Sequence, residues 1–336
     1  MRILSGNRID REAWAAFVKA HPQGNVFQTP EMYDVYTCAK HAKPIVVAAI
    51  EGNKIVGILL AQYLTNGDAL ASWITARSII TGGPLVKDNK PEIIELLMQE
   101  YRRMLPSKTI YSEIRPIYDI NELMNERVNE LMRWKRVGHY NLVLGLEKTQ
   151  EELFEQMHKE RRRNVNQAIK AGLVFKEVTD EEGIAEIVAL IKQTYERKHV
   201  PISYLDMFGE VRPLMGDYAH FFGCYTPEGK MIAGEIRLCY KDLVYAWFAG
   251  SDEAYFKLRP NDFTMWNVIC WAATEGYKSL DFGGGGEPGR PYGVRDYKLK
   301  YGCEMYDYGR YVWTHRPVTY WAAAKAYALY HKMKGK

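Results

Sequence analysis

A strand–turn–strand pattern occurs twice in this chain of 336 residues, over residues 46–60 and again over residues 221–238. Each copy reads as an apolar strand, a glycine-containing turn and a second strand, which predicts a β-hairpin. Four residues recur at a constant offset: Glu51, Gly52, Ile55 and Gly57 correspond to Glu228, Gly229, Ile232 and Gly234. A helical segment and a further strand follow both copies. The repeat and the chain length together predict two related domains.

The second strands of the two hairpins differ in polarity. In the first copy, residues 58–61 are all apolar, which is typical of a strand buried on both faces. In the second copy, Glu235 and Arg237 alternate with Ile236 and Leu238. Charges on a core strand are costly unless they are paired or face a cleft. We therefore predict a polar cleft in the second half, with a solvated sheet face as an equally open alternative.

Both halves follow the order of helices, a hairpin-containing sheet, a helix and another strand, which indicates an α+β fold. We predict a first domain over residues 1–145 and a second over residues 146–316. A C-terminal helix over residues 317–336 begins at Pro317, where proline is tolerated. This helix is expected to pack on the first domain.

The composition narrows the function classes without choosing one. A net charge of +4 permits an anionic substrate or an RNA partner but requires neither. The five cysteines form no C-x-x-C pair, and no H-E-x-x-H motif is present, so no metal site is expected. No apolar stretch approaches the ~18 residues of a membrane span, and no signal peptide is recognisable. The expected location is therefore the cytoplasm.

A basic helix is predicted after residue 149. Thr149 and Glu152 form a capping-box pattern, and the helix is expected to continue to Gly172. Its central cations are Lys159, Arg161, Arg162, Arg163 and Lys170. Most of them fit a solvated face, and Arg162 and Arg163 also suit RNA or phosphate contacts. Arg161 lies on the apolar stripe instead, where it must pair with an acid or bind an anion.

A glycine-rich segment follows a predicted strand in the second half. Asp281 precedes the four glycines at positions 283–286, whose backbone N–H groups could approach a phosphate or a substrate. A flexible loop is the alternative interpretation.

Aromatic and basic residues alternate just beyond these glycines. Tyr297, Leu299 and Tyr301 alternate with Lys298 and Lys300, which predicts a strand with both lysines on one face. A lysine beside a glycine-rich loop could stabilise an oxyanion or a phosphate. The alternative is an exposed edge strand, which often carries lysines.

Three segments of the chain give it a resemblance to a known family: residues 21–30, 159–172 and 280–302. In their order and spacing the chain resembles the Fem family of aminoacyl-tRNA-dependent peptidoglycan aminoacyltransferases and their wider GNAT-like relatives. Arg259 and Pro260, with Trp266 downstream, are similar to the family's helix entry. The resemblance implies two tandem GNAT-like domains, of which the first is degenerate.

The resemblance also implies an activity. Fem proteins move an amino acid from a charged tRNA to an amine on the stem peptide of a cell-wall precursor. This aminolysis of an ester uses no metal and no CoA. It requires an amine held against the aminoacyl carbonyl and stabilisation of the tetrahedral intermediate. Lys298 matches the lysine of the family's aromatic-Lys-x-x-aromatic-Gly segment and is expected to be the electrostatic catalyst. Arg197 matches a basic residue that holds precursor phosphates.

The chain departs from the family at two places. Some members carry a lysine in an early helix for the precursor diphosphate, and this chain has Tyr36 there. The long helical arm that certain members use for tRNA has no counterpart. A cell-wall acceptor and an exopolysaccharide acceptor therefore both remain open. A separate observation disfavours CoA, because residues 251–261 lack the glycine-rich turn that normally holds its pyrophosphate.

The residues expected at the active cleft form two groups. The catalytic candidates are Lys298, Asp281 and Tyr255. The substrate-binding candidates are Arg197, Glu235, Arg237, Arg161, Gly283 and Gly284. The cleft is expected to lie between the two domains.

The expected partners are aminoacyl-tRNA and a nucleotide- or lipid-linked peptidoglycan precursor, with no DNA. A lipid-linked acceptor would require contact with the inner face of the membrane, which the C-terminal helix could supply through Tyr320, Trp321 and the lysines at 332, 334 and 336. A core helix with a frayed basic end is the alternative. A second hypothesis is an N-acyltransferase that uses acyl-CoA or an acyl carrier on an amino sugar or amine. A third is a non-catalytic binding module.

Overall fold

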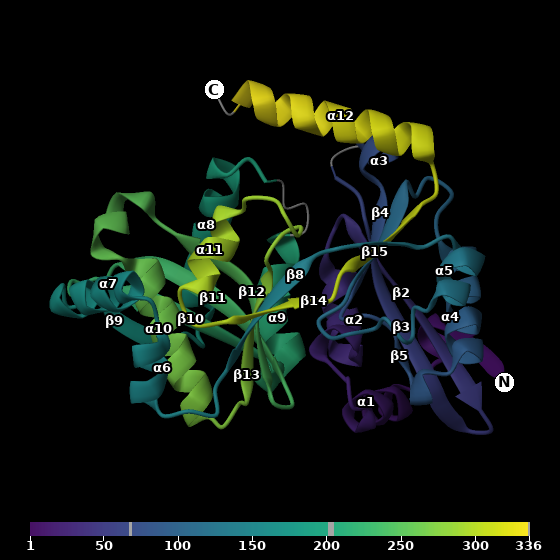
Figure 1. Cartoon of the computed structure of the whole chain (residues 1–336), viewed down its shortest axis with the longest axis horizontal. Coiled ribbons are helices and arrows are strands. Elements are labelled where there is room, and N and C mark those ends of the chain that lie inside the picture. Colours follow the sequence, from purple (N-terminus) through teal and green to yellow (C-terminus); the bar gives the residue numbers. More distant parts are fainter. Residues whose placement is uncertain (67–68, 201–204, 335–336) are drawn as a thin grey trace. The chain divides into compact units, whose positions relative to one another are not determined.

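Each of the two predicted hairpins belongs to its own mixed sheet (Figure 1). The computed structural model describes residues 1–66, 69–200 and 205–334. It divides the chain into two units, of which unit 1 comprises Met1–Gly138 with Tyr308–Lys336 and unit 2 comprises His139–Asp307. The α+β class and the tandem arrangement that the repeat predicted are confirmed.

Unit 1 contains an 8-stranded sheet in the order β1-β2-β3-β4-β6-β15-β7, with β5 paired to β3. Its neighbours are antiparallel except for β4 and β6, which are parallel and joined through α4. The strands are β1 (Arg2–Ser5), β2 (Ala42–Glu51), β3 (Lys54–Leu64), β4 (Arg77–Thr81), β5 (Leu85–Val86), β6 (Tyr111–Arg115), β7 (Lys135–Val137) and β15 (Arg310–Thr314). The α-helices are α1 (Arg11–Ala20), α2 (Pro30–Cys38), α3 (Ala69–Thr75), α4 (Pro91–Met104), α5 (Glu126–Met132) and α12 (Pro317–Lys334).

The core of unit 1 explains the apolar second strand of the first hairpin. Every residue of β3 except Lys54 is buried. Helix α4 covers the sheet with Ile94, Leu97 and Tyr101, which lie on one helical face and are fully buried. Burial of each large side chain contributes roughly 1.5–3 kcal/mol. Unit 1 therefore has a complete core of its own.

Unit 2 contains a 7-stranded sheet in the order β14-β8-β13-β12-β11-β10-β9. Among the described strand pairs of this sheet, β12 and β13 alone are parallel, and helix α10 joins them. The strands are β8 (Tyr140–Gly145), β9 (Val174–Glu177), β10 (Ala219–Tyr225), β11 (Met231–Tyr240), β12 (Leu243–Ser251), β13 (Ser279–Gly284) and β14 (Glu304–Asp307). The α-helices are α6 (Gln150–Gln156), α7 (Lys159–Lys170), α8 (Glu181–Arg197), α9 (Phe208–Met215), α10 (Pro260–Thr274) and α11 (Gly293–Leu299).

The unit boundaries differ from the predicted positions at residues 145 and 316. Strand β8 pairs with β13 and β14, which assigns residues 139–145 to unit 2. Strand β15 pairs with β6 and β7, which returns residues 308–316 to unit 1. Strand propensity alone does not indicate which sheet a strand joins, so the sequence misplaced both strands.

The C-terminal helix α12 is assigned to unit 1. The Tyr320 ring packs edge-on against Tyr111, with 5.4 Å between ring centroids, and the Arg316 guanidinium lies over the Trp73 ring. The side chains of Lys332 and Lys334 and the whole of Lys336, named as membrane contacts, lie outside the described part of the structure. Within residues 1–66, 69–200 and 205–334, no helix combines the length and apolar character needed to cross a membrane.

The predicted basic helix is interrupted at Met157 and His158. The Thr149–Glu152 capping box starts α6, as predicted, but α6 ends at Gln156 and α7 begins at Lys159. The backbone N–H of His158 donates to the Lys300 carbonyl at 2.8 Å, and the His158 ring caps α7. The His158 N–H thus binds a distant carbonyl in place of a helical one. The periodicity of the sequence gives no sign of this break.

Gly250 allows β12 to pass directly against α8. A Cβ at this position would lie 2.3 Å from both Ile191 N and Leu190 C. These are backbone atoms, so Gly250→Ala must displace the helix, and we expect the free energy of unfolding to fall by about 3 kcal/mol. Urea denaturation followed by circular dichroism measures this loss.

Gly145→Ala is the matched control, because a Cβ there meets no atom within 4 Å. Equal unfolding midpoints for the two variants would contradict the close packing of β12 on α8.

Candidate active site

A pocket of about 450 Å³ opens in unit 2 where two parallel strands separate. Strands β12 and β13 pair only from Leu243 with Ser279 to Tyr245 with Asp281. Beyond these pairs residues 246–251 of β12 line the pocket, together with residues of β11, α8, α10 and α11. All lining residues belong to unit 2, so unit 2 forms the walls of the pocket by itself.

Lys298 on α11 lies in the wall of this pocket. Its Nζ donates a hydrogen bond to the Gly284 carbonyl at 2.8 Å. Burial lowers the pKa of Lys298 to about 8, although the nearby Asp281 carboxylate opposes the shift. An ammonium group has three donors, so Lys298 retains hydrogen-bonding capacity toward a ligand after binding Gly284.

Asp281 fixes the turn that carries the Gly284 carbonyl. Its Oδ1 accepts the Gly283 backbone N–H at 2.6 Å, and its Oδ2 accepts the Asn141 side-chain amide at 3.1 Å. Burial raises the pKa of Asp281 to about 6, while these two hydrogen bonds act in the opposite direction. Asp281 is 1% exposed and lies behind the pocket wall. Gly283 has a φ of 73°, which favours glycine at this bend.

Glu235 and Arg237 form a buried ion pair on β11 and line the same pocket. Their side chains share one face because they are two residues apart on a strand. Arg237 is only 2% exposed, and burial lowers its pKa to about 10. The Nε of Arg237 is buried and has no hydrogen-bond partner. These charges face a cleft and not bulk solvent, so the solvated-face alternative is wrong.

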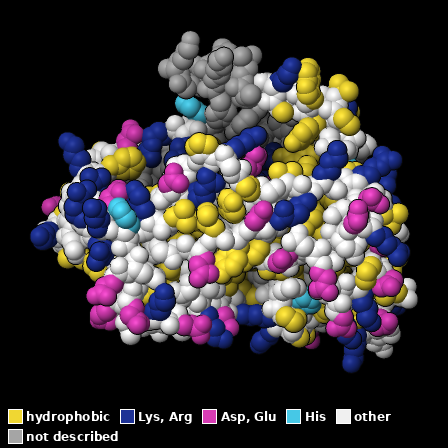
Figure 2. Space-filling model, in the orientation of Figure 1, with side chains coloured by type: hydrophobic (Ala, Val, Ile, Leu, Met, Phe, Trp, Pro, Cys, Tyr) yellow, Lys and Arg dark blue, Asp and Glu magenta, His cyan; other side chains and the backbone are white. Residues whose placement is uncertain are grey.

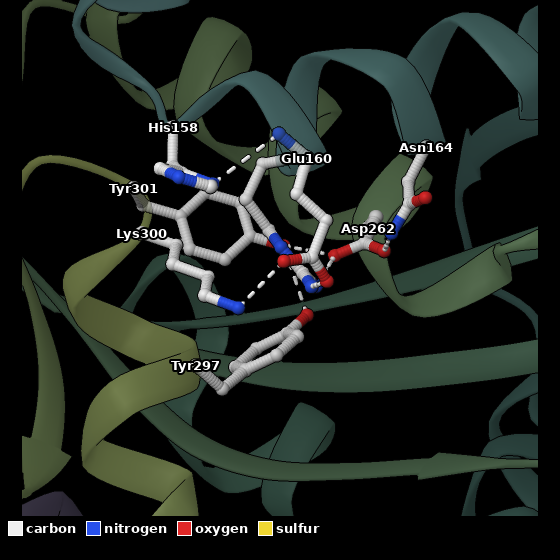
Figure 3. Close-up of polar contacts among 8 residues, drawn as sticks. His158, Glu160, Asn164, Asp262, Tyr297, Lys300 and Tyr301 are labelled. Atoms are coloured by element: carbon white, nitrogen blue, oxygen red, sulfur yellow. Dashed lines mark hydrogen bonds and ion pairs between the residues drawn. The ribbon is translucent and has the colours of Figure 1, made fainter.

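A second polar cluster is centred on Asp262 at the start of α10 (Figure 3). The Asp262 carboxylate accepts hydrogen bonds from Arg161 at 2.5 Å, from Asn164 at 2.7 Å and from Tyr301 at 2.7 Å. Burial alone would lower the pKa of Arg161, but the Asp262 carboxylate outweighs it and raises that pKa. Arg161 is therefore paired with an acid, one of the two roles that its position on the apolar stripe required.

Glu160 holds the outer side of this cluster. It accepts hydrogen bonds from Lys300 at 2.6 Å and from Arg161 at 2.5 Å (Figure 3). The bond from Lys300, with the charge of Arg161, lowers the pKa of Glu160 to about 2. The Arg161 guanidinium also lies 4.8 Å from the centroid of the Tyr297 ring. Because Tyr297 lines the pocket, the cluster supports the pocket wall from behind.

The predicted strand over residues 297–301 is wrong, because this segment forms α11 and its C-terminal turn. Tyr297 and Tyr301 are four residues apart and share one helical face, where their hydroxyl groups lie 2.8 Å apart. Lys298 and Lys300 consequently point to different partners, Gly284 and Glu160. A five-residue alternation does not distinguish a strand from a helix that places its aromatic residues one turn apart.

The remaining candidates lie away from the pocket wall. Tyr255, in the 3-10 helix Glu253–Leu258, accepts a hydrogen bond from Lys230 at 3.3 Å and does not line the pocket. Arg197 ends α8, where it approaches the Ser251 carbonyl at 3.5 Å and forms an ion pair with Glu253. Ser251 itself lines the pocket, so Arg197 lies beside the rim.

Several residues of the site carried no signal in the sequence. Asn141 on β8 binds Asp281 across a separation of 140 residues. Thr194 on α8 accepts the Ser251 backbone N–H at 2.9 Å and lines the pocket. Single polar residues of this kind are recognised only when the sheet brings their elements together.

The segment between β12 and α10 uses its backbone N–H groups internally. The Tyr255 N–H donates to the Asp252 carbonyl at 3.2 Å, and the Arg259 N–H donates to the Phe256 carbonyl at 3.1 Å. The Ala254 N–H is taken by the Asp252 side chain at 3.0 Å. A pyrophosphate would find few free donors in this turn.

Comparison with protein families places the pocket in a known domain. Residues 151–299 match the model of the acetyltransferase (GNAT) domain. Residues 151–299 of unit 2 form a GNAT domain. No curated protein sequence matches the chain. The GNAT domain contains the parallel pair β12–β13, the pocket and Lys298, and the protein is an acyltransferase.

Solved structures extend the likeness beyond the GNAT domain to the whole chain. FemX has a TM-score of 0.72 at 15% identity, over 96% of this chain and 99% of that chain. L-PGS from Bacillus licheniformis has a TM-score of 0.58 at 14% identity, over 93% of this chain and 95% of that chain. A tandem GNAT protein from the clavulanic acid biosynthesis pathway has a TM-score of 0.57 at 11% identity, over 93% of this chain and 98% of that chain. At these identities the likeness shows a shared fold, which confirms the Fem-like tandem architecture.

Proposed function

We propose that this protein transfers an aminoacyl group from aminoacyl-tRNA to an amine of a peptidoglycan precursor. The observation that carries the proposal is Lys298, whose ammonium lines the pocket next to the Gly284 carbonyl. Its position in the sequence matches the lysine of Fem proteins, and FemX shares the fold of the entire chain. The proposed location is the cytoplasm, with membrane-surface contact when the acceptor is lipid-linked.

The chemistry assigned to the pocket is aminolysis of an ester. The neutral amine of the acceptor attacks the aminoacyl carbonyl carbon and forms a C–N bond, which places a negative charge on the carbonyl oxygen. The C–O bond to the tRNA ribose then breaks, and the proton lost from the amine nitrogen compensates the leaving oxygen. Lys298 would donate a hydrogen bond to the oxyanion, with little reorganisation because Gly284 already holds its Nζ.

Other pocket residues would bind and orient the two substrates. Glu235 and Arg237 offer opposite charges at the inner wall, where burial strengthens their interaction with polar substrate groups. Arg197 lies beside the rim and would hold an acceptor phosphate. Asp281 acts as a positioning residue, because both of its oxygens are occupied in fixing the turn at Gly283 and Gly284.

The second candidate function is N-acylation of an amine or amino sugar with acyl-CoA. The match to the acetyltransferase (GNAT) domain and the likeness to the tandem GNAT protein favour it. The internally bonded turn over residues 252–259 disfavours it, because this turn leaves few donors for the CoA pyrophosphate.

Transfer of radiolabelled amino acids from a charged total-tRNA pool tests the proposal. We expect label to appear in a nucleotide-linked or a lipid-linked precursor, and we expect acetyl-CoA to show no saturable binding in calorimetry. Label in neither precursor, with tight CoA binding by the same folded preparation, would contradict the tRNA donor and support the acyl-CoA alternative.

A further inference from the structure

A line of cations follows the exposed face of helix α7. Lys159, Arg162, Arg163 and Lys170 line a groove of about 630 Å³ with the ring of Phe154. Figure 2 shows this gathering of Lys and Arg side chains in dark blue on the left. Their positions, 159, 162, 163 and 170, lie on one side of the helix and extend over roughly 16 Å along its axis.

No acid neutralises these cations within the part of the chain that the structure describes. Glu160, the acid of α7 itself, is bound by Arg161 and Lys300. None of the four groove cations forms an ion pair with another described residue. The Nε of Arg162 is buried without a hydrogen-bond partner. Four cations that share one groove without acidic partners favour an anionic ligand there.

The length and lining of the groove distinguish between anions. Duplex nucleic acid carries one charge per about 1.7 Å of its axis, so roughly 16 Å of groove would face several phosphates. Asn166 and Gln167 add amide groups to the lining, and the Gln167 amide is fixed by the Lys257 carbonyl at 2.8 Å. Phe154 is held edge-on against Trp266, at 5.0 Å between ring centroids, and offers a rigid aromatic surface.

A membrane surface fits this groove less well. Helices that bind bilayers present a broad apolar face beside their cations. Phe154 is the one apolar side chain in the groove lining, and the remaining lining residues are basic or carry amides. We infer that the groove on α7 binds the phosphate backbone of RNA and is the docking surface for the tRNA that donates the amino acid. This inference rests on the proposed function.

The two faces of α7 connect the groove to the active pocket. Arg161 on the inner face lies over the Tyr297 ring, which lines the pocket. An α-helix with side chains is about 10 Å across. RNA on the outer face of α7 would therefore lie about one helix diameter from this wall of the pocket, within reach of a tRNA acceptor end.

Binding of uncharged tRNA, measured by fluorescence anisotropy over a range of salt concentrations, tests the inference without turnover. For Arg162→Gln/Arg163→Gln we expect binding about 30-fold weaker near 0.1 M salt, with the slope of log K against log salt smaller by about 1.5, because two phosphate contacts are lost. Arg162→Lys/Arg163→Lys keeps both charges and should keep most of the slope.

Lys192→Gln/Lys278→Gln is the matched control, because it removes the same amount of charge from two exposed lysines that lie outside the groove. Its tRNA affinity should stay within a few-fold of wild type. Wild-type affinity and slope in the groove variant would overturn the inference, as would binding of wild type to phosphatidylglycerol vesicles but not to tRNA. Groove-dependent tRNA binding without amino acid transfer would contradict the proposed function alone. If wild type transfers amino acids and the groove variant binds tRNA normally, the groove is not the docking surface, but the proposed function stands.

Discussion

Replacement of Lys298 with methionine is expected to lower kcat by about 100- to 1000-fold, the usual cost of removing one oxyanion donor. The substitution keeps much of the side-chain volume and removes only the ammonium that binds Gly284. Lys298 is not part of the Asp262 cluster, so the fold should persist, which thermal unfolding can verify. Single-turnover transfer from charged tRNA measures the loss and separates the chemical step from product release.

Lys300→Met is the matched control for this variant. Lys300 lies two residues away and binds Glu160, outside the pocket lining. Its transfer rate should remain within a few-fold of wild type. A Lys298→Met enzyme that keeps a third of the wild-type rate, or equal losses in both variants, would contradict the assignment of Lys298 to the chemistry.

The pH profile gives a second readout of Lys298. Its pKa is lowered to about 8, so the ammonium form is present below pH 8 and is lost as the pH rises through that value. A role in charge stabilisation predicts that kcat falls above pH 8. In Lys298→Arg this descending limb should disappear, because the guanidinium stays charged over the accessible range. A rate that increases through pH 8 in wild type but not in Lys298→Arg would instead indicate that Lys298 acts as a base.

Replacement of Asp262 with asparagine is expected to lower the free energy of unfolding by about 3–5 kcal/mol, because the buried guanidinium of Arg161 loses its buried carboxylate partner and keeps only the more exposed Glu160. Asp262 is 5% exposed and Arg161 is 7% exposed. The same carboxylate also accepts hydrogen bonds from Asn164 and Tyr301, and the NH2 group of asparagine would replace one of its two accepting oxygens with a donor that faces these donors. Urea unfolding measures the loss, and the denaturant dependence checks that the transition remains two-state.

Two further variants separate the ion pair from simple loss of packing. Arg161→Met/Asp262→Leu removes both charges and should recover part of the stability, since apolar groups of similar size often replace a buried pair without loss, while Asn164 and Tyr301 still lose their acceptor. Glu160→Gln changes the exposed partner of Arg161 and should have a much smaller effect. A fully stable Asp262→Asn protein, or a double variant as unstable as the single one, would contradict the role of this ion pair.

The parts of the fold that the sequence predicted are those governed by local or periodic patterns. The two hairpins follow from strand pattern and turn glycines, and Gly52 and Gly229 both adopt positive φ in the observed turns. The burial of Arg161 follows from helical spacing. Its partner Asp262 lies about a hundred positions away, and no periodicity connects them. The break at His158 likewise depends on the Lys300 carbonyl, which is far away in the sequence.

The candidate site shows the same division. Glu235 and Arg237 were found because charges interrupt an otherwise apolar strand, and both line the pocket. The family resemblance identifies Lys298, whereas the alternation around it predicts a strand in place of helix α11. Tyr255 does not line the pocket that holds Lys298. Its position on a short 3-10 helix depends on how β12 leads into α10, which the sequence of that segment does not specify.

The chain passes from unit 1 into unit 2 at residue 139 and returns at residue 308. Inside unit 2 its first and last strands, β8 and β14, are antiparallel neighbours, and the His139 N–H binds the Asp307 carboxylate at 2.9 Å. Inside unit 1 the returning strand β15 lies between β6 and β7. During synthesis on the ribosome, the sheet of unit 2 can therefore be completed as soon as β14 emerges. The sheet of unit 1 begins to form first, but the position between β6 and β7 stays empty until β15 follows. The half that is made first is completed last.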